Sequence, residues 1–506
     1  MAAVEVAPPT GGVEEKGLKT GALGFVSSVV IGVASTAPGY SLAATLGFVT
    51  AVAGIGFHAP IVMVLAFVPM YLIALAFKYM NQADPDCGTT FTWAARAFGP
   101  MTGWLGGWGV IYADVLVMAS LSQIAGSYTF LLFGADSYAN STFWVGVAGV
   151  VWIILMCAIC YIGVEMSART QYFLLAAEII TLAVFAGVAL VKVYTGHLHG
   201  AVHPSLSWLN PFGIGSFGAL TSGMLLAIFI YWGWDTAVSV NEETEDATRT
   251  PGRAAVVSTF LLLAIYLIVS FAAQAVHGVN FLNNHSSDVL SALGKDVLGS
   301  PWDKLLIIAV LTSASASTQT TILPATRQAL SMAAHGAFPK HFGRINTKHL
   351  SPGVGTIWMG VISIVCFVTL NSVSSNILGD SVTATGFGIA FYYGLTGFAC
   401  TWYYRKELGK SRHNLIFIGL APFLGGLILF VLLVYDVYQQ TDPANTNVGT
   451  AWLGVGPPVA IGGIALALGI VLMLIQRAVA PEPYFRWKTE TADPAVLEAH
   501  QKGSHA

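Results

Sequence analysis

The chain has 506 residues, of which 55% are hydrophobic and only 9% are charged. A soluble globular protein carries roughly a quarter charged residues. This composition, with a mean hydropathy of +0.70, therefore excludes a soluble protein and indicates a polytopic membrane protein. The net charge of −3 gives no basis for a nucleic-acid partner.

Long apolar runs fill the chain, which favours membrane-spanning helices over the alternating ten-residue strands of a barrel. A spanning helix needs about 20 apolar residues, and twelve segments reach this length. An even number of spans places both termini on one side of the membrane. The expected spans are 21–52, 58–79, 101–133, 142–163, 168–193, 215–247, 252–278, 303–333, 354–371, 378–404, 414–437 and 455–477.

Lysine and arginine are distributed unevenly among the segments that connect these spans. If both termini are cytoplasmic, 19 of the 22 basic residues lie inside and only Lys192, Lys295 and Lys304 lie outside. Basic residues concentrate in cytoplasmic loops, so the sequence predicts a multi-pass protein of the plasma (cytoplasmic) membrane with both termini inside. A missed or extra span would destroy this alternation, so the distribution also supports the number twelve.

The two ends of the chain are polar, and no cleavable signal sequence is visible. The first apolar run is too long for the hydrophobic segment of a signal peptide. We expect residues 1–18 to form a disordered cytoplasmic tail and residues 482–506 a second one.

Two expected spans are unusually long and are interrupted near their centres. The first breaks at Ala34–Gly39 (A-S-T-A-P-G), where Pro38 cannot donate a backbone hydrogen bond and clashes with the preceding turn. The sixth breaks at Trp232–Asp235 (W-G-W-D). Either break alone is compatible with a simple kink. Two breaks in corresponding spans of two halves indicate an inverted-repeat transporter with a site at the membrane midplane.

The positions of the breaks divide the chain into parts. Spans 1–5 and 6–10 are the expected repeats, 19–193 and 215–405, which together form a transport core over residues 19–405. Residues 406–481 hold two peripheral helices, spans 11 and 12.

A broken helix leaves N–H groups without partners at the start of one half and carbonyl groups at the end of the other. The start near Ala37 favours an anion such as a carboxylate, and the carbonyl ends favour an ammonium group. The pair suits a small zwitterion or an amine. The aromatic residues offer cation–π contacts or serve only for packing. The predicted substrate-binding residues are Ser35, Thr36, Ala37, Gly39, Phe229, Tyr231, Trp232, Gly233 and Asp235.

Four stretches resemble signatures of the amino acid–polyamine–organocation (APC) transporter family. In order, they are Pro85–Pro100, F-x-x-x-G-x-D at Phe229–Asp235, N-E-E-T-E-D-A-T-R-T-P-G-R-A at Asn241–Ala254, and Arg327–Asn346. The resemblance implies an all-α polytopic membrane protein with a LeuT-type 5+5 inverted repeat, 12 transmembrane helices and broken helices 1 and 6. It also implies secondary transport of amino acids or amines by alternating access.

The first break departs from the family pattern. Many members carry a glycine-rich G-[ST]-G there, whereas this chain has Ser35-Thr36-Ala37-Pro38-Gly39. The proline removes one N–H group from the expected carboxylate site, so amines become an alternative to amino acids.

Three acidic residues fall well inside expected spans: Asp114, Glu178 and Asp235. Each costs about 2.5–3.5 kcal/mol at a helix centre on insertion scales, so a paired or functional role is the default expectation. Asp235 is expected either to link substrate binding to gating or to cap the inner half-helix. Asp114, with Tyr392, is a possible contact for a cationic substrate; otherwise Asp114 bonds to Ser120 or Gln123.

Glu178 is the candidate for proton coupling. It lies seven residues after Gln171, where some proton-coupled family members carry a lysine. The resemblance therefore implies that Glu178 exchanges the coupling proton near Ser313, Ser315 and Ser317. The alternative is a neutral glutamic acid that only bonds between helices.

Two other features are expected to be structural. The acidic cluster of Glu242, Glu243, Glu245 and Asp246 is interpreted as a solvated helix end near Arg249 and Arg253. The glycines Gly103, Gly106, Gly107 and Gly109 give the third span a small-residue face for close helix packing.

The sequence thus predicts a secondary active transporter that imports amino acids or related amines by proton-coupled symport. A substrate–product exchanger is the alternative. An enzyme is not expected, because most of the twelve histidines lie in loops or tails without metal-like spacing. No metal or organic cofactor is expected, and the coupling ion is expected to be H⁺. The sequence does not indicate the oligomeric state.

Overall fold

The computed structural model describes residues 16–286, 288–373 and 377–493. Within these ranges the chain is helical, and its β-structure is confined to two isolated bridges, Leu23 with Thr244 and Trp452 with Val455. The all-helical architecture agrees with the sequence prediction.

Ten helical segments in the described ranges are long and apolar enough to cross a membrane, and each coincides with an expected span. They are α1 with α2 (Phe25–Ser35, Pro38–Ala51), η1 with α3 (Gly56–His58, Ala59–Ala83), α5 (Pro100–Leu132), α7 (Thr142–Ile162), α8 (Val164–Tyr194), α11 (Thr250–Asn284), α13 (Lys304–Ala334), α14 (Gly353–Val373), η7 with α16 (Asn414–Leu420, Ala421–Gln439) and α17 (Pro457–Val479).

The two remaining expected spans are helical in the structure but differ from these ten. The sixth is divided into α9 (Phe217–Ile230) and the short α10 (Thr236–Ser239), and the tenth is α15 (Ile377–Tyr403). Short helices fill the connections: α4 (Thr90–Phe98), α6 (Asp136–Ala139), α12 (Val289–Leu298), η2 (Leu206–Leu209), η3 (Pro211–Gly213), η4 (Asn241–Glu243), η5 (Lys340–Gly343), η6 (Leu408–Lys410), η8 (Pro443–Asn445) and η9 (Tyr484–Arg486).

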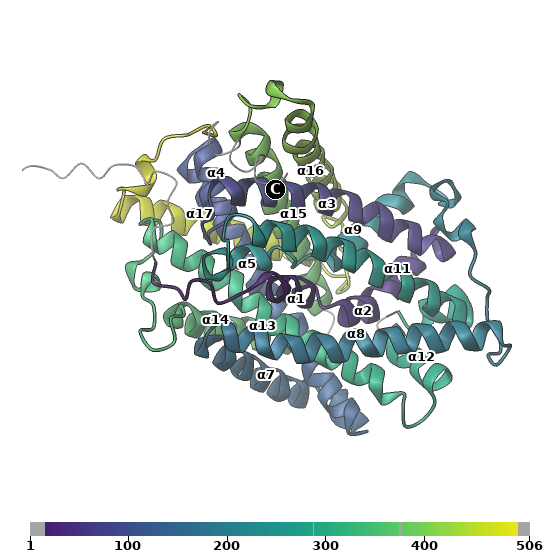
Figure 1. Cartoon of the computed structure of the whole chain (residues 1–506). Coiled ribbons are helices and arrows are strands. Elements are labelled where there is room, and N and C mark those ends of the chain that lie inside the picture. The colour runs from purple at the N-terminus through teal and green to yellow at the C-terminus, as the bar shows by residue number, and fades with distance from the viewer. Residues whose placement is uncertain (1–15, 287, 374–376, 494–506) are drawn as a thin grey trace, which may run out of the picture.

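Helix α13 lies in the interior of the bundle and packs against α5, α8 and α1 (Figure 1). Its run Ser313–Thr321 consists of small and polar residues, all of them buried. Polar side chains cannot face lipid without losing their hydrogen bonds, so such a helix is stable only inside the protein. In contrast, α7 and α17 expose many Ile, Leu and Val side chains, as expected for helices at the lipid boundary.

The small-residue face of α5 is confirmed as a close packing surface. A Cβ atom at Gly103 would lie 2.5 Å from the carbonyl oxygen of Phe91 and 2.5 Å from Cβ of Ala95, both in α4. A Cβ at Gly107 would lie 2.6 Å from Nε2 of Gln328 in α13. These glycines therefore allow α5 to contact two helices at backbone distance.

Both ends of the described chain pack against the ends of helices on the same side of the bundle. Residues 1–15 and 494–506, which include most of the first expected tail, lie outside the described residues. For Lys16 and Leu18 the expectation of disorder is wrong, because both are buried. The C-terminal residues 482–493 also dock: Tyr484 stacks on Phe91 at 4.8 Å between ring centroids, and Glu490 pairs with Arg96 at 2.6 Å.

We predict that Gly103→Ala destabilises the protein, although alanine is the better helix former by about 1 kcal/mol. The added methyl group would clash with the α4 backbone, and overpacking costs roughly 1–3 kcal/mol. Gly187→Ala is the matched control, because no atom lies within 4 Å of a Cβ at that helical position. Thermal unfolding in detergent should show a lower melting temperature for Gly103→Ala only; equal melting temperatures for the two variants would contradict the packing.

Candidate functional site

The first break separates α1 from α2 at Thr36 and Ala37. Ala37 adopts a left-handed conformation (φ 48°, ψ 63°), which costs roughly 1–2 kcal/mol for a residue with a side chain. Pro38 then occupies the first turn of α2, where its fixed φ suits the helix and its missing N–H group costs nothing. The helix therefore ends and restarts within two residues, at the predicted position.

The N–H groups at this break all have partners within the protein. Thr36 and Ala37 donate to carbonyl groups of the last turn of α1, at 3.2 and 3.1 Å. Gly39 donates to Oε1 of Glu178 at 2.6 Å, and Tyr40 donates to Oγ of Ser313 at 3.1 Å. The N-terminal end of α2 thus holds a carboxylate, as its dipole favours, but the carboxylate belongs to α8.

Only one of the two carboxylate oxygens of Glu178 accepts hydrogen bonds from described residues. Its Oε1 accepts hydrogen bonds from the Gly39 N–H group and from the hydroxyl of Ser313, at 2.6 and 2.9 Å. Its Oε2 is buried and has no hydrogen-bond partner among the described residues, as is also true of Oγ of Ser315. The structure therefore brings Glu178 to the first break beside the predicted serines of α13.

The second break lies at residues 231–235, between α9 and α10. Gly233 has φ 121°, a conformation that side chains rarely allow. A Cβ atom at Gly233 would lie 2.7 Å from the carbonyl carbon and oxygen of Ser35. Only glycine fits this position, because the backbones of the two breaks touch there.

Side chains fasten the two breaks together. The hydroxyls of Ser35 and Thr236 are 2.8 Å apart, and Ser317 of α13 donates to the carbonyl oxygen of Ser35 at 2.8 Å. Ser41 donates to the carbonyl oxygen of Thr36 at 2.7 Å. Backbone groups that lost their helical partners are therefore satisfied by hydroxyls from neighbouring elements.

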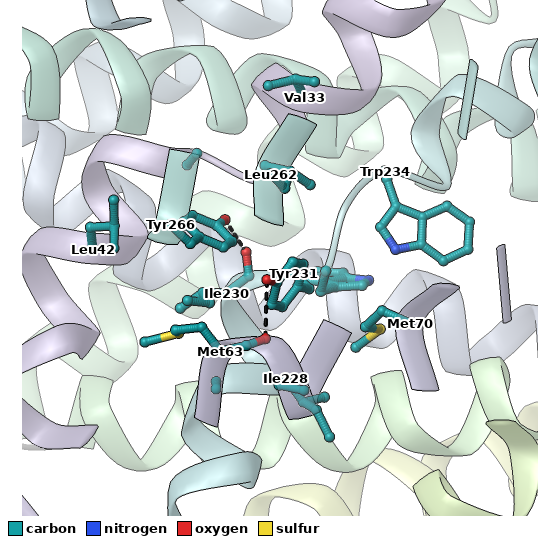
Figure 2. Close-up of a cluster of buried hydrophobic side chains, with 14 of the residues drawn as sticks. Val33, Leu42, Met63, Met70, Ile228, Ile230, Tyr231, Trp234, Leu262 and Tyr266 are labelled. Atoms are coloured by element: carbon teal, nitrogen blue, oxygen red, sulfur yellow. Dashed lines mark hydrogen bonds between the residues drawn. The ribbon is translucent and has the colours of Figure 1, made fainter. Parts of the chain in front are cut away.

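The end of α9 is fixed by two tyrosines, as Figure 2 shows. Tyr266 of α11 donates to the carbonyl oxygen of Ile230, and Tyr231 donates to the carbonyl oxygen of Met63 at 3.2 Å. The two rings lie edge to face at 4.9 Å between centroids. Sequence reasoning placed Tyr231 at the site but missed Tyr266. The only signal was a phenol in the middle of an otherwise apolar span.

Asp235 faces α15 through both carboxylate oxygens. Tyr392 donates to Oδ2 at 2.9 Å and Tyr393 donates to Oδ1 at 2.8 Å, while Nε1 of Trp232 donates to the hydroxyl of Tyr392 at 2.5 Å. Asp235 stands at the N-cap position of α10, yet its side chain makes no capping bond. Capping of the inner half-helix is therefore not what this carboxylate does.

The aromatic residues at the second break differ in their surroundings. Trp234 is fully buried, packs against Phe77 and Tyr393 at 5.1 and 5.0 Å, and its Nε1 has no partner among the described residues. Trp232 is 8% exposed, and Phe229 is partly buried. Trp232 is thus the aromatic side chain that the structure joins directly to the Tyr392–Asp235 pair.

Asp114 of α5 lies within electrostatic range of Asp235 and Tyr392 and close to the backbone of Ala325. Its Oδ2 is buried and unpartnered among the described residues. Of the neighbouring polar groups expected as partners of Asp114, Ser120 is not one, since its hydroxyl donates to the carbonyl oxygen of Val117 at 3.0 Å. No bond of Asp114 to Gln123 is found in the described part of the chain.

None of these three buried carboxylates forms an ion pair with a described residue. The ion pairs of the described ranges lie elsewhere, mostly near the ends of the helices. An isolated buried charge is strongly disfavoured unless it is compensated. Glu178, Asp235 and Asp114 are therefore the buried carboxylates described here whose negative charge, when they are ionised, no basic residue of the described ranges compensates.

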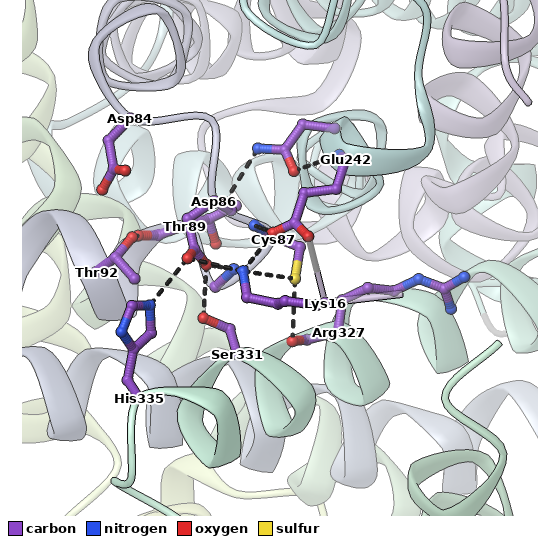
Figure 3. A network of polar contacts seen from close by, with 12 residues as sticks. Lys16, Asp84, Asp86, Cys87, Thr89, Thr92, Glu242, Arg327, Ser331 and His335 are labelled. Atoms are coloured by element: carbon purple, nitrogen blue, oxygen red, sulfur yellow. Dashed lines mark hydrogen bonds and ion pairs between the residues drawn. The ribbon is translucent and has the colours of Figure 1, made fainter. Parts of the chain in front are cut away.

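A second polar network lies at one end of the helix bundle (Figure 3). Lys16 lies among Asp86, Glu242 and Cys87: its Nζ is 2.8 Å from Oδ2 of Asp86 and 3.9 Å from Sγ of Cys87, and it also pairs with Glu242. Ligand atoms of Asp86, Cys87 and Glu242 lie within 4.8 Å of one another. The ammonium group of Lys16 contacts all three of these residues.

The expectation of a solvated acidic cluster is wrong for Glu242 and Glu243. Both are buried, and Glu243 accepts two hydrogen bonds from Arg327 of α13, at 2.8 and 2.9 Å. The side chains of Arg327 and Glu243 are almost entirely inaccessible to solvent. Sequence proximity favoured Arg249 and Arg253, but the partners come from segments that are distant in the chain.

Burial disfavours the charged forms of Lys16 and Asp86 in this polar network, whereas the neighbouring charges favour them. Burial alone would lower the pKa of Lys16, but Asp86, Cys87 and Glu242 raise it well above its ordinary value. Burial would likewise raise the pKa of Asp86, but Lys16 and His335 hold it well below the usual range. Burial raises the pKa of Glu242 despite Lys16. Lys16 and Asp86 are therefore both charged near neutral pH.

Comparison with known proteins gives a consistent result. The amino acid permease family AA_permease_2 matches residues 21–466. The chain is 22% identical to the branched-chain amino acid permease BcaP of Lactococcus lactis, over 73% of this chain and 80% of that protein. It is 22% identical to the low-affinity putrescine importer PlaP of Escherichia coli (79% and 84%) and to the arginine/ornithine antiporter of Latilactobacillus sakei (72% and 78%).

We predict that Lys16→Met destabilises the protein by about 3–5 kcal/mol, because it leaves buried carboxylates uncompensated. The loss should be the same at pH 7 and pH 9. Because the pKa of Lys16 is raised, its charge contributes to the free energy of unfolding until the pH rises well above 10. Because the pKa of Asp86 is lowered, its charge contributes until the pH falls far below 4. Melting temperatures of the wild type and of Lys16→Met in a zwitterionic detergent, at pH 7 and at pH 9, measure this loss.

The matched control is Lys19→Met, because Lys19 pairs with Glu165 while about half exposed, and such pairs contribute about 0–1 kcal/mol. If the difference between wild type and Lys16→Met shrinks from pH 7 to pH 9, burial dominates at Lys16 and the stated charge assignment is incorrect.

Proposed function

Because this chain belongs to the amino acid permease family, we propose that it imports amino acids or related amines across the plasma (cytoplasmic) membrane by alternating access. The family and these relatives are transporters, not enzymes. We further propose a LeuT-type 5+5 inverted repeat with twelve spans, in which residues 19–193 and 215–405 are the repeats and residues 406–481 are peripheral. The observation that carries the proposal is the contact of Gly233 with the backbone of Ser35, since it joins two broken helices deep inside the bundle.

The proposed substrate site is the junction of the two breaks. Ends of half-helices attract charged groups, and the interior position excludes water. The proposed substrate-binding residues are Ser35, Thr36, Ala37, Gly39, Phe229, Tyr231, Trp232, Gly233 and Asp235, with Asp114 and Tyr392 as contacts for a cationic group.

An ammonium group fits this junction better than a carboxylate. The N–H groups of Thr36, Ala37, Gly39 and Tyr40 already donate to protein acceptors, so a substrate carboxylate would have to displace one of them. Asp235 and Asp114 offer negative charge with no ion-pair partner among the described residues. Similarity to a putrescine importer is consistent with an amine substrate. Similarity to a branched-chain amino acid permease means that amino acids are also candidate substrates.

We propose that Glu178 carries the coupling proton. Ionised Glu178 stabilises the start of α2 through the Gly39 N–H group, because a negative charge is favoured at a helix N-terminus. Protonation removes that charge and weakens the attachment of α2 to α8. The unpartnered Oε2 leaves a position where the proton can bind. Proton uptake would thus alter the same backbone that forms the substrate site.

Exchange of one substrate for another is the second candidate function. One relative is named an arginine/ornithine antiporter, and an exchanger needs no coupling proton. The two candidates differ in what drives net accumulation. We propose cytoplasmic termini for either case, because 19 of the 22 basic residues then lie on the inner side.

We predict that Glu178→Gln abolishes accumulation driven by a proton gradient in proteoliposomes while substrate counterflow continues. One coupled proton and a gradient of one pH unit support about tenfold accumulation, since one pH unit corresponds to about 1.36 kcal/mol. Glutamine keeps an oxygen that can accept the hydrogen bond from the Gly39 N–H group, but its amide does not bind or release a proton in the accessible pH range. Asp436→Asn, in peripheral helix α16, is the control and should accumulate substrate like the wild type.

Two results would separate the candidates. Unchanged accumulation in Glu178→Gln would remove Glu178 from coupling. Counterflow without gradient-driven accumulation in the wild type would favour the exchanger.

We predict that Asp235→Asn weakens binding of a diamine more than binding of a branched-chain amino acid. A hydrogen bond to a charged group contributes about 1.5–3 kcal/mol, so diamine affinity should fall roughly 10- to 100-fold. A thermal-shift titration of purified protein with both ligands, again with Asp436→Asn as control, measures this. Equal losses for the two ligands would argue against a contact between Asp235 and the ammonium group.

A further inference from the structure

A basic cavity lies at the ends of the spanning helices, where three segments of the chain meet. It has a volume of about 230 Å³ and is lined by the segment before α1, the end of α7 with the first two turns of α8, and the connection between α13 and α14. Lys19, Arg169 and Lys348 each come from a different one of these segments. All three segments belong to the inner side in the orientation proposed above, so their convergence is consistent with it.

The walls of this cavity are fixed by hydrogen bonds. Asn346 donates to the hydroxyl of Tyr161 at 2.8 Å, and Ser351 donates to the carbonyl oxygen of Tyr161 at 2.7 Å. The side chain of Asn346 also accepts from the N–H group of Lys348 at 2.9 Å. These bonds hold the connection before α14 against the end of α7, so the cavity is part of the folded structure.

The cavity has an excess of positive charge. Glu165 is its one acidic lining residue and pairs with Lys19 at 2.8 Å. Arg169 and Lys348 form no ion pair with any of the described residues. The lining therefore carries three basic side chains against one carboxylate. The first turn of α8 adds N–H groups without a side-chain cap. This arrangement selects an anion.

The rim of the cavity is apolar and exposed. Ile162, Met166 and Leu350 are 46%, 41% and 38% exposed, and the first two stand at the ends of membrane-spanning helices. A free anion gains nothing from such a rim, whereas the acyl chains of a lipid cover it. Basic cavities between spanning helices on the cytoplasmic side are suited to acidic lipid headgroups.

We propose that this cavity binds the phosphate of an anionic phospholipid, such as phosphatidylglycerol, from the adjoining leaflet. Arg169 and Lys348 hold the phosphate, and Ile162, Met166 and Leu350 contact the acyl chains. The site is separate from the breaks and does not depend on which solute is transported.

The test compares lipid binding to detergent-purified full-length protein and to the double variant Arg169→Gln, Lys348→Gln. Each basic residue near a membrane surface contributes about 1 kcal/mol, so affinity for short-chain phosphatidylglycerol should fall about 30-fold. Phosphatidylcholine should bind weakly to both proteins. Native mass spectrometry, which counts bound lipids, provides the measurement.

The matched control is Lys340→Gln, Arg344→Gln, which removes the same charge from exposed positions in the same connection but outside the cavity. It should bind phosphatidylglycerol like the wild type. An equal loss in both double variants would overturn the site. Competition by inorganic phosphate as strong as that by the lipid would show a site for free anions and would overturn the lipid assignment.

A second experiment uses only the wild-type protein, so its result does not depend on whether the variants fold. Thermal protection by phosphatidylglycerol over phosphatidylcholine should be present at about 0.15 M salt and largely lost at about 1 M, where the screening length falls from about 8 to about 3 Å. Protection that is insensitive to salt, or equal for the two lipids, contradicts binding through Arg169 and Lys348.

Discussion

The backbone contact between the two interrupted helices is the constraint on which the rest of the structure depends. Gly233 has no side chain and a φ of 121°, and this allows the second break to lie directly on the carbonyl group of Ser35. Both helices must be unwound for the contact to form, and each unwound peptide group then needs a new partner. Ser317, Tyr266 and Glu178 supply those partners from three surrounding helices.

Buried charge is treated in two ways in this bundle. At one end of the bundle, Arg327 with Glu243 and Lys16 with Asp86 are paired within hydrogen-bond distance. In such a pair each charge is compensated by its partner, and the pair holds segments from different parts of the chain together. In the interior, Glu178, Asp235 and Asp114 have no ion-pair partner among the described residues. A buried charge that the chain leaves uncompensated is unfavourable unless a proton or another cation neutralises it.

The same end of the bundle also shows how the ends of the chain contribute to the fold. Lys16 reaches the connection between α3 and α4, while Trp487 stacks on His335 at 5.3 Å and lies against Arg96. Since His335 also contacts Asp86 at 3.0 Å, the N-terminal segment contacts this carboxylate directly and the C-terminal segment is linked to it through His335. Separating the helices at this end of the bundle would therefore also break contacts made by both ends of the described chain.

Composition, apolar run length and the interrupting Pro38 and Gly233 determined the membrane class, the helix positions and the two breaks, because these properties act within a single segment. Pairings between distant segments were decided only by the tertiary structure: Glu178 against Gly39, Asp235 against Tyr393, and Glu242 against Lys16 instead of the nearer Arg249 and Arg253. The physical reason is that a buried polar group bonds to whichever complementary group the packing brings within about 3 Å, and separation along the chain does not limit that choice.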